Sequence, residues 1–159
     1  MDIKLEHNYF KKLLNMMGKE FVDDLKKELK ILNKDATGNL INSLDYKVSE
    51  VNNEWYIEII SADYLIYVDK GRRPGKRPPI KDIKPWVEAK GIKIPKLKGG
   101  FITSESAAYI IAKSIGEKGI KPLNFIQRVQ TDLFQRYESK IKIALKQDYE
   151  EYIKKIIVV

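Results

Sequence analysis

The stretch of sequence that decides the fold runs from Tyr64 to Trp86 and reads YLIYVDKGRRPGKRPPIKDIKPW. It begins with an apolar, aromatic segment that Gly71 ends, continues as a loop rich in Arg, Lys and Pro, and closes on a segment with a short helical pattern. Proline fixes φ and lowers the entropy lost on ordering, so the loop at 71–79 is expected to be stiff. The stretch therefore predicts a rigid basic loop held on a small scaffold, which is typical of a contact surface.

Positive charge is concentrated around this loop. Between Lys70 and Lys98 there are eleven Lys and Arg residues and two acidic residues, a local charge of +9, whereas the whole chain carries +8. A localised positive field attracts an acidic protein surface or a phosphate backbone. The alternative is a solvated loop that only aids solubility, because runs of lysine are commonly solvated. Four loop residues are the candidate contacts with a partner or with DNA: Arg72, Arg73, Lys76 and Arg77.

Length and composition limit the class of protein. A chain of 159 residues is typical of one domain, so a single domain over 1–159 is expected. The hydrophobic content of 43% is sufficient for a folded core. The absence of cysteine excludes disulfides and fits a reducing cytoplasm. No apolar run approaches the roughly 20 residues needed to span a bilayer, and the N-terminal residues lack a signal-peptide pattern, so no membrane partner is expected.

Both ends of the chain predict long amphipathic helices. Over residues 8–33, apolar side chains recur every three or four positions, with Lys and Glu on the other face. Over about 126–158 an apolar stripe advances mostly in steps of four, through Val129, Leu133, Tyr137, Ile141, Leu145, Tyr149, Tyr152 and Ile156. A step of four drifts about 40° around an ideal helix, so this stripe needs one curved partner or two successive partners. The last helix is therefore expected to reach a neighbour beyond its own domain.

The middle of the chain predicts a hairpin and shorter helices. Alternating residues at 46–51 and 55–60 flank Asn52-Asn53, a pattern typical of a β-hairpin. Helices are expected at 82–90, with Trp86 and Val87 turned inward, and at 104–118, with its small residues packed on the sheet. The fold class is therefore α+β, a small antiparallel sheet packed against helices with long N- and C-terminal amphipathic helices. Four aromatic residues are the expected core anchors: Trp55, Tyr64, Trp86 and Phe125.

Catalytic chemistry has little support in the sequence. The lone histidine, His7, lies near the N-terminus, where a histidine is more often a surface residue than a general base, and no cysteine, phosphate-binding loop or metal-spaced ligand set is present. Asp63, Asp69 and Asp82 with nearby lysines leave one alternative, a small nuclease whose carboxylates bind Mg²⁺. The pairing of two carboxylates and a lysine on adjacent strands is not evident. We therefore expect no enzyme and no catalytic, cofactor-binding or metal-binding residues.

Four segments in order carry a resemblance to a known family. Residues 37–44 (TGNLINSL) are similar to a threonine-glycine-leucine turn after the first helix, and 64–71 (YLIYVDKG) to an aromatic-x-x-aromatic-Val-acid-x-Gly signature. The Arg-Pro loop then leads to 83–92, and 108–125 resembles a helix followed by a Gly-x-x-Pro-x-x-Phe turn. Together, over about residues 10–135, they resemble the tail-completion family of bacteriophages, also described as minor tail components or head–tail joining (neck) proteins. This chain departs from the family in having Arg72 where Thr or Ser is usual, and in its longer last helix.

The resemblance implies a structural virion protein of a tailed bacteriophage, assembled in the host cytoplasm. Such a protein forms a homo-oligomeric ring at the head–tail junction and joins portal or neck to tail around the DNA channel. Its partners would be copies of itself, other neck, portal-adaptor or tail proteins, and DNA through non-specific contact. The alternative from another class is a free nucleic-acid-binding module that uses the basic segment 70–98.

Overall fold

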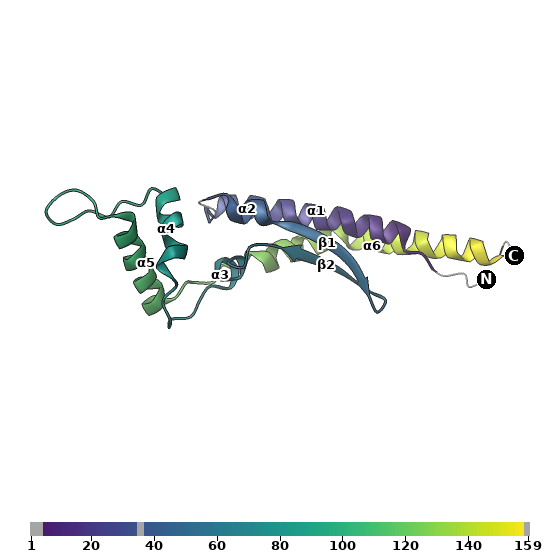
Figure 1. Ribbon diagram of the computed structural model, residues 1–159. Helices are drawn as coiled ribbons and strands as arrows, with labels where there is room; N and C mark the ends of the chain where they lie inside the picture. The colour runs from purple at the N-terminus through teal and green to yellow at the C-terminus, as the bar shows by residue number, and fades with distance from the viewer. Residues whose placement is uncertain (1–4, 35–36, 158–159) are drawn as a thin grey trace. The chain divides into compact units, whose positions relative to one another are not determined.

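The computed structural model describes residues 5–34 and 37–157, and its fold is α+β (Figure 1). The elements in chain order are α1 (Asn8–Ile31), α2 (Asn39–Ser43), β1 (Asp45–Val51), β2 (Glu54–Ile60), α3 (Leu65–Lys70), α4 (Ile80–Ala89), α5 (Ser104–Lys118) and α6 (Phe125–Ile157). The small antiparallel sheet and the long helices near both ends are confirmed. The predicted residue 158 lies outside the described residues. Among the helices described, none is long and apolar enough to cross a membrane.

The described chain forms two compact units, each built from separate stretches of sequence. The first unit contains residues 5–28, 44–60 and 125–157, and the second contains 29–34, 37–43 and 61–124. Compact units within one chain do not by themselves establish independent folding. The single domain over 1–159 therefore stays a prediction.

In the first unit, α1 and α6 lie antiparallel, and polar side chains join them along their length. The ion pairs that join them are Arg128–Glu28 at 2.7 Å, Arg136–Glu20 at 2.7 Å and Arg136–Asp24 at 2.5 Å. Beyond the start of α1, Lys155 of α6 pairs with Glu6 at 3.1 Å. Between the two helices, the hydroxyl of Tyr137 donates to Glu20 at 2.5 Å. Residues early in α1 meet residues late in α6, as an antiparallel pair requires. Because each contact joins one particular residue of α1 to one of α6, these contacts fix the register of the two helices.

The first turn of α1 is capped by a side chain from α6. Asp148, which is 2% exposed, accepts a hydrogen bond from the backbone N–H of Tyr9 at 2.8 Å and from that of Phe10 at 2.9 Å. The first N–H groups of a helix have no partner within the helix, and a carboxylate there also meets the positive end of the helix dipole. The first turn of α1 has no acidic residue of its own. A residue 139 positions away therefore supplies the cap.

The hairpin β1–β2 covers one face of α1. Its register pairs Tyr46 with Ile59 and Val48 with Ile57, and the turn residues Asn52 and Asn53 have φ of 53° and 63°. Two positive φ values are the form of a type I′ turn, whose twist matches that of the strands, so the predicted hairpin is confirmed. The Tyr46 ring occupies the space that a Cβ at Gly18 would need. A glycine in mid-helix costs about 1 kcal/mol relative to alanine, and this close approach offsets that cost.

The buried stripe of α6 departs from the predicted one in its second half. Leu133 and Tyr137 are buried as predicted, but Leu145 and Tyr149 are 40% and 57% exposed. The stripe takes one step of three residues after Ile141 and continues through Ala144 and Asp148. A step of three rotates the stripe back by about 60°, which compensates for the drift of the earlier steps of four. One antiparallel partner, α1, therefore contacts both halves of the stripe.

The core of the second unit lies between α4 and α5. Val87, Ala107 and Ala108 are buried there, and six half-buried isoleucines pack around them: Ile80, Ile83, Ile92, Ile94, Ile102 and Ile111. α5 has the predicted bounds, and Thr103 caps it by accepting from the N–H of Ser106. The small-residue face of α5, predicted to lie on the sheet, instead packs against α4. Side chains of one methyl group let the two helices approach closely.

The predicted anchors divide into buried and exposed residues. Phe125 is 0% exposed, and Trp55 is half-buried and contacts the Phe10 ring edge-on at 6.1 Å. Trp86 and Tyr64 are 37% and 41% exposed, so the prediction that they anchor the core is wrong. In α4 it is the neighbouring Val87 that points inward, because adjacent helical residues point about 100° apart.

Candidate interaction surface

The basic loop between α3 and α4 is fixed to the end of α5 by backbone hydrogen bonds. Arg72 and Ile120 exchange both of theirs, at 2.9 Å and 2.7 Å. Further along the loop, the N–H of Gly75 donates to the carbonyl of Gly116 at 2.7 Å. The start and the middle of the loop are therefore held by Ile120, two residues after α5, and by the last turn of α5. The stiffness predicted from the prolines has a second source in these contacts.

Three glycines make this close approach possible. Gly71 has φ 69° and ψ −165°, and Gly119 has φ 74° and ψ −165°, a region that only glycine adopts readily. A Cβ at Gly71 would collide with the carbonyl of Ile120, and one at Gly119 with that of Arg72. A Cβ at Gly116, inside α5, would lie 2.7 Å from Cγ of Arg77. Gly71 was expected from the sequence to end a segment, but Gly116 was not singled out, because nothing local distinguishes a helical glycine that a contact requires.

Two of the four candidate arginines and lysines are held in place by aromatic rings. The guanidinium of Arg72 lies 5.8 Å from the centre of the Tyr67 ring, and its Nη2 donates to the carbonyl of Lys76 at 2.6 Å. The guanidinium of Arg77 lies 5.7 Å from the centre of the Tyr109 ring and donates to its hydroxyl at 3.3 Å. A cation over an aromatic face is attracted by the ring quadrupole. Both tyrosines are about half exposed, so the arginines stay open to a partner.

The candidate cations have no carboxylate partner of their own in the part of the chain that is described. None of Arg72, Arg73, Lys76 and Arg77 lies within 4.0 Å of an Asp or Glu oxygen there. Arg73, Lys76 and Arg77 are exposed, and Arg72 is half-buried. The structure therefore brings the four predicted residues together on one loop and leaves their charge uncompensated by neighbouring carboxylates.

The aspartates considered for a nuclease lie in different settings. Asp69, at the end of α3, is 0% exposed, and its carbonyl accepts from the N–H of Leu123 and of Asn124 at 2.8 Å and 2.9 Å. Asp63 and Asp82 are exposed. Within residues 5–34 and 37–157, no three His, Cys, Asp or Glu side chains gather in a way that could hold a metal ion. Asp69 thus helps to position the turn before α6.

The lone histidine packs among aromatic rings. His7 meets Trp55 edge-on with ring centres 6.1 Å apart, and Phe10 at 6.3 Å. It is half-buried rather than a freely exposed surface residue. The three rings close one end of the hairpin against the start of α1.

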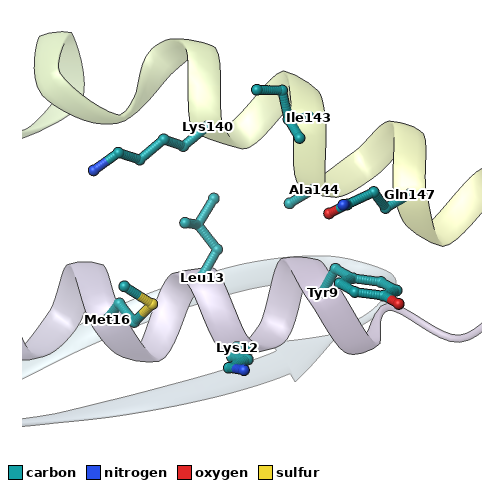
Figure 2. A pocket seen from close by; sticks show the side chains of 8 residues that line it. All are labelled: Tyr9, Lys12, Leu13, Met16, Lys140, Ile143, Ala144 and Gln147. Carbon is teal, nitrogen blue, oxygen red and sulfur yellow. The ribbon is translucent and has the colours of Figure 1, made fainter.

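An open groove runs between α1 and α6 in the first unit, with a volume of about 240 Å³ (Figure 2). Leu13 and Ala144, both buried, form its floor. The other lining residues are Tyr9, Lys12 and Met16 of α1 and Lys140, Ile143 and Gln147 of α6. The lining contains two lysines and no carboxylate, so the groove combines apolar surface with positive charge.

Comparison of the chain with protein-family models, curated proteins and solved structures finds no match.

Proposed function

We propose that the protein is a structural virion protein of a tailed bacteriophage, a tail-completion or neck protein. In this proposal it forms a ring at the head–tail junction and joins portal or neck to tail around the DNA channel. The basic loop at 71–79 contacts an acidic surface of a neighbouring subunit, or DNA in the channel. The protein acts without catalysis and without a cofactor.

The observation that carries the proposal is the state of the basic loop. It is fixed through Arg72 and Gly75 to the end of α5, and its four candidate cations have no carboxylate partner in the described residues. A loop that is already ordered loses little entropy when it docks. Arginine can bind a carboxylate or a phosphate through two parallel hydrogen bonds, which a loop serving solubility alone does not require.

The order of elements supports the same proposal. The segments that carry the family resemblance form, in turn, the short helix α2, the helix α3 that ends before Gly71, the basic loop with α4, and α5 with the turn leading into α6. The second half of α6 also exposes apolar side chains, among them Tyr149 at 57% and Ile157 at 75%. Exposed apolar surface of this kind is a common feature of interfaces between subunits.

The role of the loop is tested by replacing Arg72, Arg73 and Arg77 together by Gln. The monomer should stay folded, because the guanidiniums of Arg72 and Arg77 contact half-exposed rings, a hydroxyl and a carbonyl while backbone bonds hold the loop, whereas particle assembly and infectivity should fall. The matched control replaces three exposed lysines outside the loop, Lys11, Lys30 and Lys34, by Gln and removes the same charge. A triple arginine variant that assembles and infects as well as the parent would show that the loop makes no required contact.

The virion role itself is tested by electron microscopy of particles produced without this protein. We expect filled heads and separate tails, because the joining ring is missing. Normal tailed particles would contradict the proposal.

A second candidate function, a free nucleic-acid-binding module, is favoured by the two guanidiniums held over exposed tyrosine rings. Aromatic faces and arginines together bind single strands by stacking and by phosphate contacts. The isolated monomer would then bind DNA with a slope of log K against log salt of roughly −3 to −4 for four phosphate contacts. A flat salt dependence, or no binding at low salt, would exclude this candidate.

A further inference from the structure

In the first unit the hairpin packs on one side of α1. Gly18 faces the hairpin, where the Tyr46 ring packs on it. At 100° per residue, Tyr9 and Met16 lie on the opposite side of α1 from Gly18. They are 40% and 51% exposed, and Ile143 beside them on α6 is 57% exposed. We call this surface, which includes the groove of Figure 2, the open helix face.

The charge of the open helix face at the groove is positive. Lys12 and Lys140 are its charged residues, one on each helix, and no carboxylate lines the groove. Lys140 is placed by the ring of Tyr137, whose centre lies 4.4 Å from its Nζ. Of the carboxylates near the groove, Glu20 pairs with Arg136 and Glu151 accepts from the Tyr9 hydroxyl. Asp23 lies beyond Met16, in a hollow that Lys19 and Lys27 also line. The two lysines therefore present positive charge beside apolar side chains.

The hairpin has an outer face with the opposite character. Tyr46 and Trp55 point towards α1, so the alternate residues of each strand point away from it. Among these, Val51, Tyr56 and Ile60 are 53%, 43% and 51% exposed. The charged residues of this outer hairpin face are Asp45, Glu54 and Glu58 against Lys47, a net charge of −2. Apolar side chains are thus interspersed with negative charge.

We propose that the open helix face of one copy binds the outer hairpin face of a second copy. Met16, Tyr9 and Ile143 meet the apolar side chains of the hairpin, and Lys12 and Lys140 meet its carboxylates. The two surfaces are different and lie on opposite sides of the first unit, so a chain of bound copies still offers one free helix face at one end and one free hairpin face at the other. Such a head-to-tail contact generates a ring when its rotation closes. The inference rests on the proposed function and names the interface that the ring would use.

The first test reverses the charge on each surface separately. The helix-face variant carries Lys12→Glu and Lys140→Glu, and the hairpin variant carries Glu54→Lys and Glu58→Lys. Each variant alone should associate at least about tenfold more weakly than the parent in light scattering and native mass spectrometry, because like charges then face each other. The association of the parent should also weaken with added salt.

The decisive experiment mixes the two charge-reversed variants. The helix-face variant keeps its acidic hairpin, which fits the unchanged basic helix face of the hairpin variant. The acidic helix face of the first variant likewise fits the basic hairpin of the second. Assemblies should therefore return in the one-to-one mixture, which a misfolded variant would not allow. If each variant assembles like the parent, or if the mixture stays as weak as its components, the inference is overturned.

The second test uses the absence of cysteine in the chain. A double variant, Met16→Cys with Tyr56→Cys, treated with a bis-maleimide cross-linker should give a ladder of dimers, trimers and larger species. The matched single variants should stay monomeric, because the residue opposite their cysteine is not a cysteine. Dimers from either single variant would instead show a symmetric contact and overturn the inference.

The outcomes separate this inference from the proposed function. A parent protein that remains monomeric at about 100 µM in low salt overturns the head-to-tail contact, although other virion proteins would still be able to recruit it to the junction. Normal tailed particles without the protein overturn the virion role, while charge-dependent assembly in solution would still stand.

Discussion

The two units of this chain hold themselves together in different ways. In the first unit, side chains on long helices meet across large sequence separations, as in the pairs Arg128–Glu28 and Asp148 with the N–H of Tyr9. In the second unit, backbone groups of short elements and loops bond directly to one another, as between Arg72 and Ile120. Glycines permit that approach, at Gly116 and Gly119.

The difference determines what the charged residues are available for. Arg136 of the first unit is neutralised by two carboxylates, so its charge serves the pairing of α1 with α6. Arg72 and Arg77 of the second unit contact tyrosine rings and uncharged oxygens, and backbone bonds hold their loop instead. A loop whose shape does not depend on its cations can offer them to a partner without losing that shape.

The largest expected effect contrasts a buried aromatic residue of the first unit with an exposed one of the second. Phe125→Ala should lower the free energy of unfolding by about 3–5 kcal/mol, because the side chain is 0% exposed. Trp86→Ala should cost about 1 kcal/mol, since its ring is 37% exposed. Phe134→Ala, also on α6 but 56% exposed, is the control. Urea unfolding measures these free energies. Equal losses of unfolding free energy for Phe125→Ala and Trp86→Ala would contradict this contrast between the two units.

Glycine substitution should be the most damaging change in the second unit. Gly119→Ala is expected to cost about 2–3 kcal/mol, because it combines an unfavourable φ and ψ with a clash against the carbonyl of Arg72. Gly91→Ala is the matched control, with φ +60° and open space around the added methyl group. It should cost about 1 kcal/mol from backbone strain alone. Thermal unfolding measures both, and equal costs would show that the close approach contributes nothing.

Removing the helix cap tests the long-range polar contacts of the first unit. Asp148→Ala should cost about 2 kcal/mol and increase hydrogen exchange at the first turn of α1, because the N–H groups of Tyr9 and Phe10 lose their acceptor. Asp132→Ala removes an exposed carboxylate from the same helix and should change stability by less than about 0.5 kcal/mol. No difference between the two variants would mean that the cap contributes nothing to stability.

The smallest expected effect on stability concerns the Tyr137 hydroxyl, and its size should depend on pH. The hydrogen bond to Glu20, assisted by burial, raises the pKa of Tyr137 from 10.0 to about 12. The folded state therefore holds this proton more tightly than the unfolded state, so the resulting stability is complete below pH 10 and is lost as the pH rises towards 12. Tyr137→Phe should cost about 1 kcal/mol at pH 8. The gap between parent and variant should narrow in urea unfolding above pH 10, and a constant gap would contradict this account.

Local patterns predicted most of the secondary structure. The pair Asn52-Asn53 located the hairpin to within a residue on each strand, and the helix expected at 104–118 has the bounds of α5. α4 begins two residues earlier than predicted, at Ile80, directly after Pro79. These signals are reliable because caps, turns and periodicity act within a few residues of the element that they define.

The contacts between distant residues were not predictable in the same way. Asp148 appears in the sequence as a polar residue beside an apolar stripe, and only the position of α1 makes it a buried cap. The exposure of Trp86 depends on which face α5 covers. The four candidate cations were found from charge and proline content, but Tyr67, Tyr109 and Gly116, which position two of them, were not. No short-range signal marks which distant residue will fill a given space.

The pairing of α1 with α6 also has a consequence for how the chain is made. Asp148, which caps α1 at Tyr9, lies 139 residues later in the chain. During synthesis α1 therefore leaves the ribosome long before α6 does. At about 5–20 residues per second, the 139 residues between them take about 7–28 seconds to synthesise. Residues 61–124 emerge during that interval and have their α4–α5 contacts within reach. Throughout that time the apolar side chains of α1 that will pack on α6 lack that partner, and the emergence of α6 covers them.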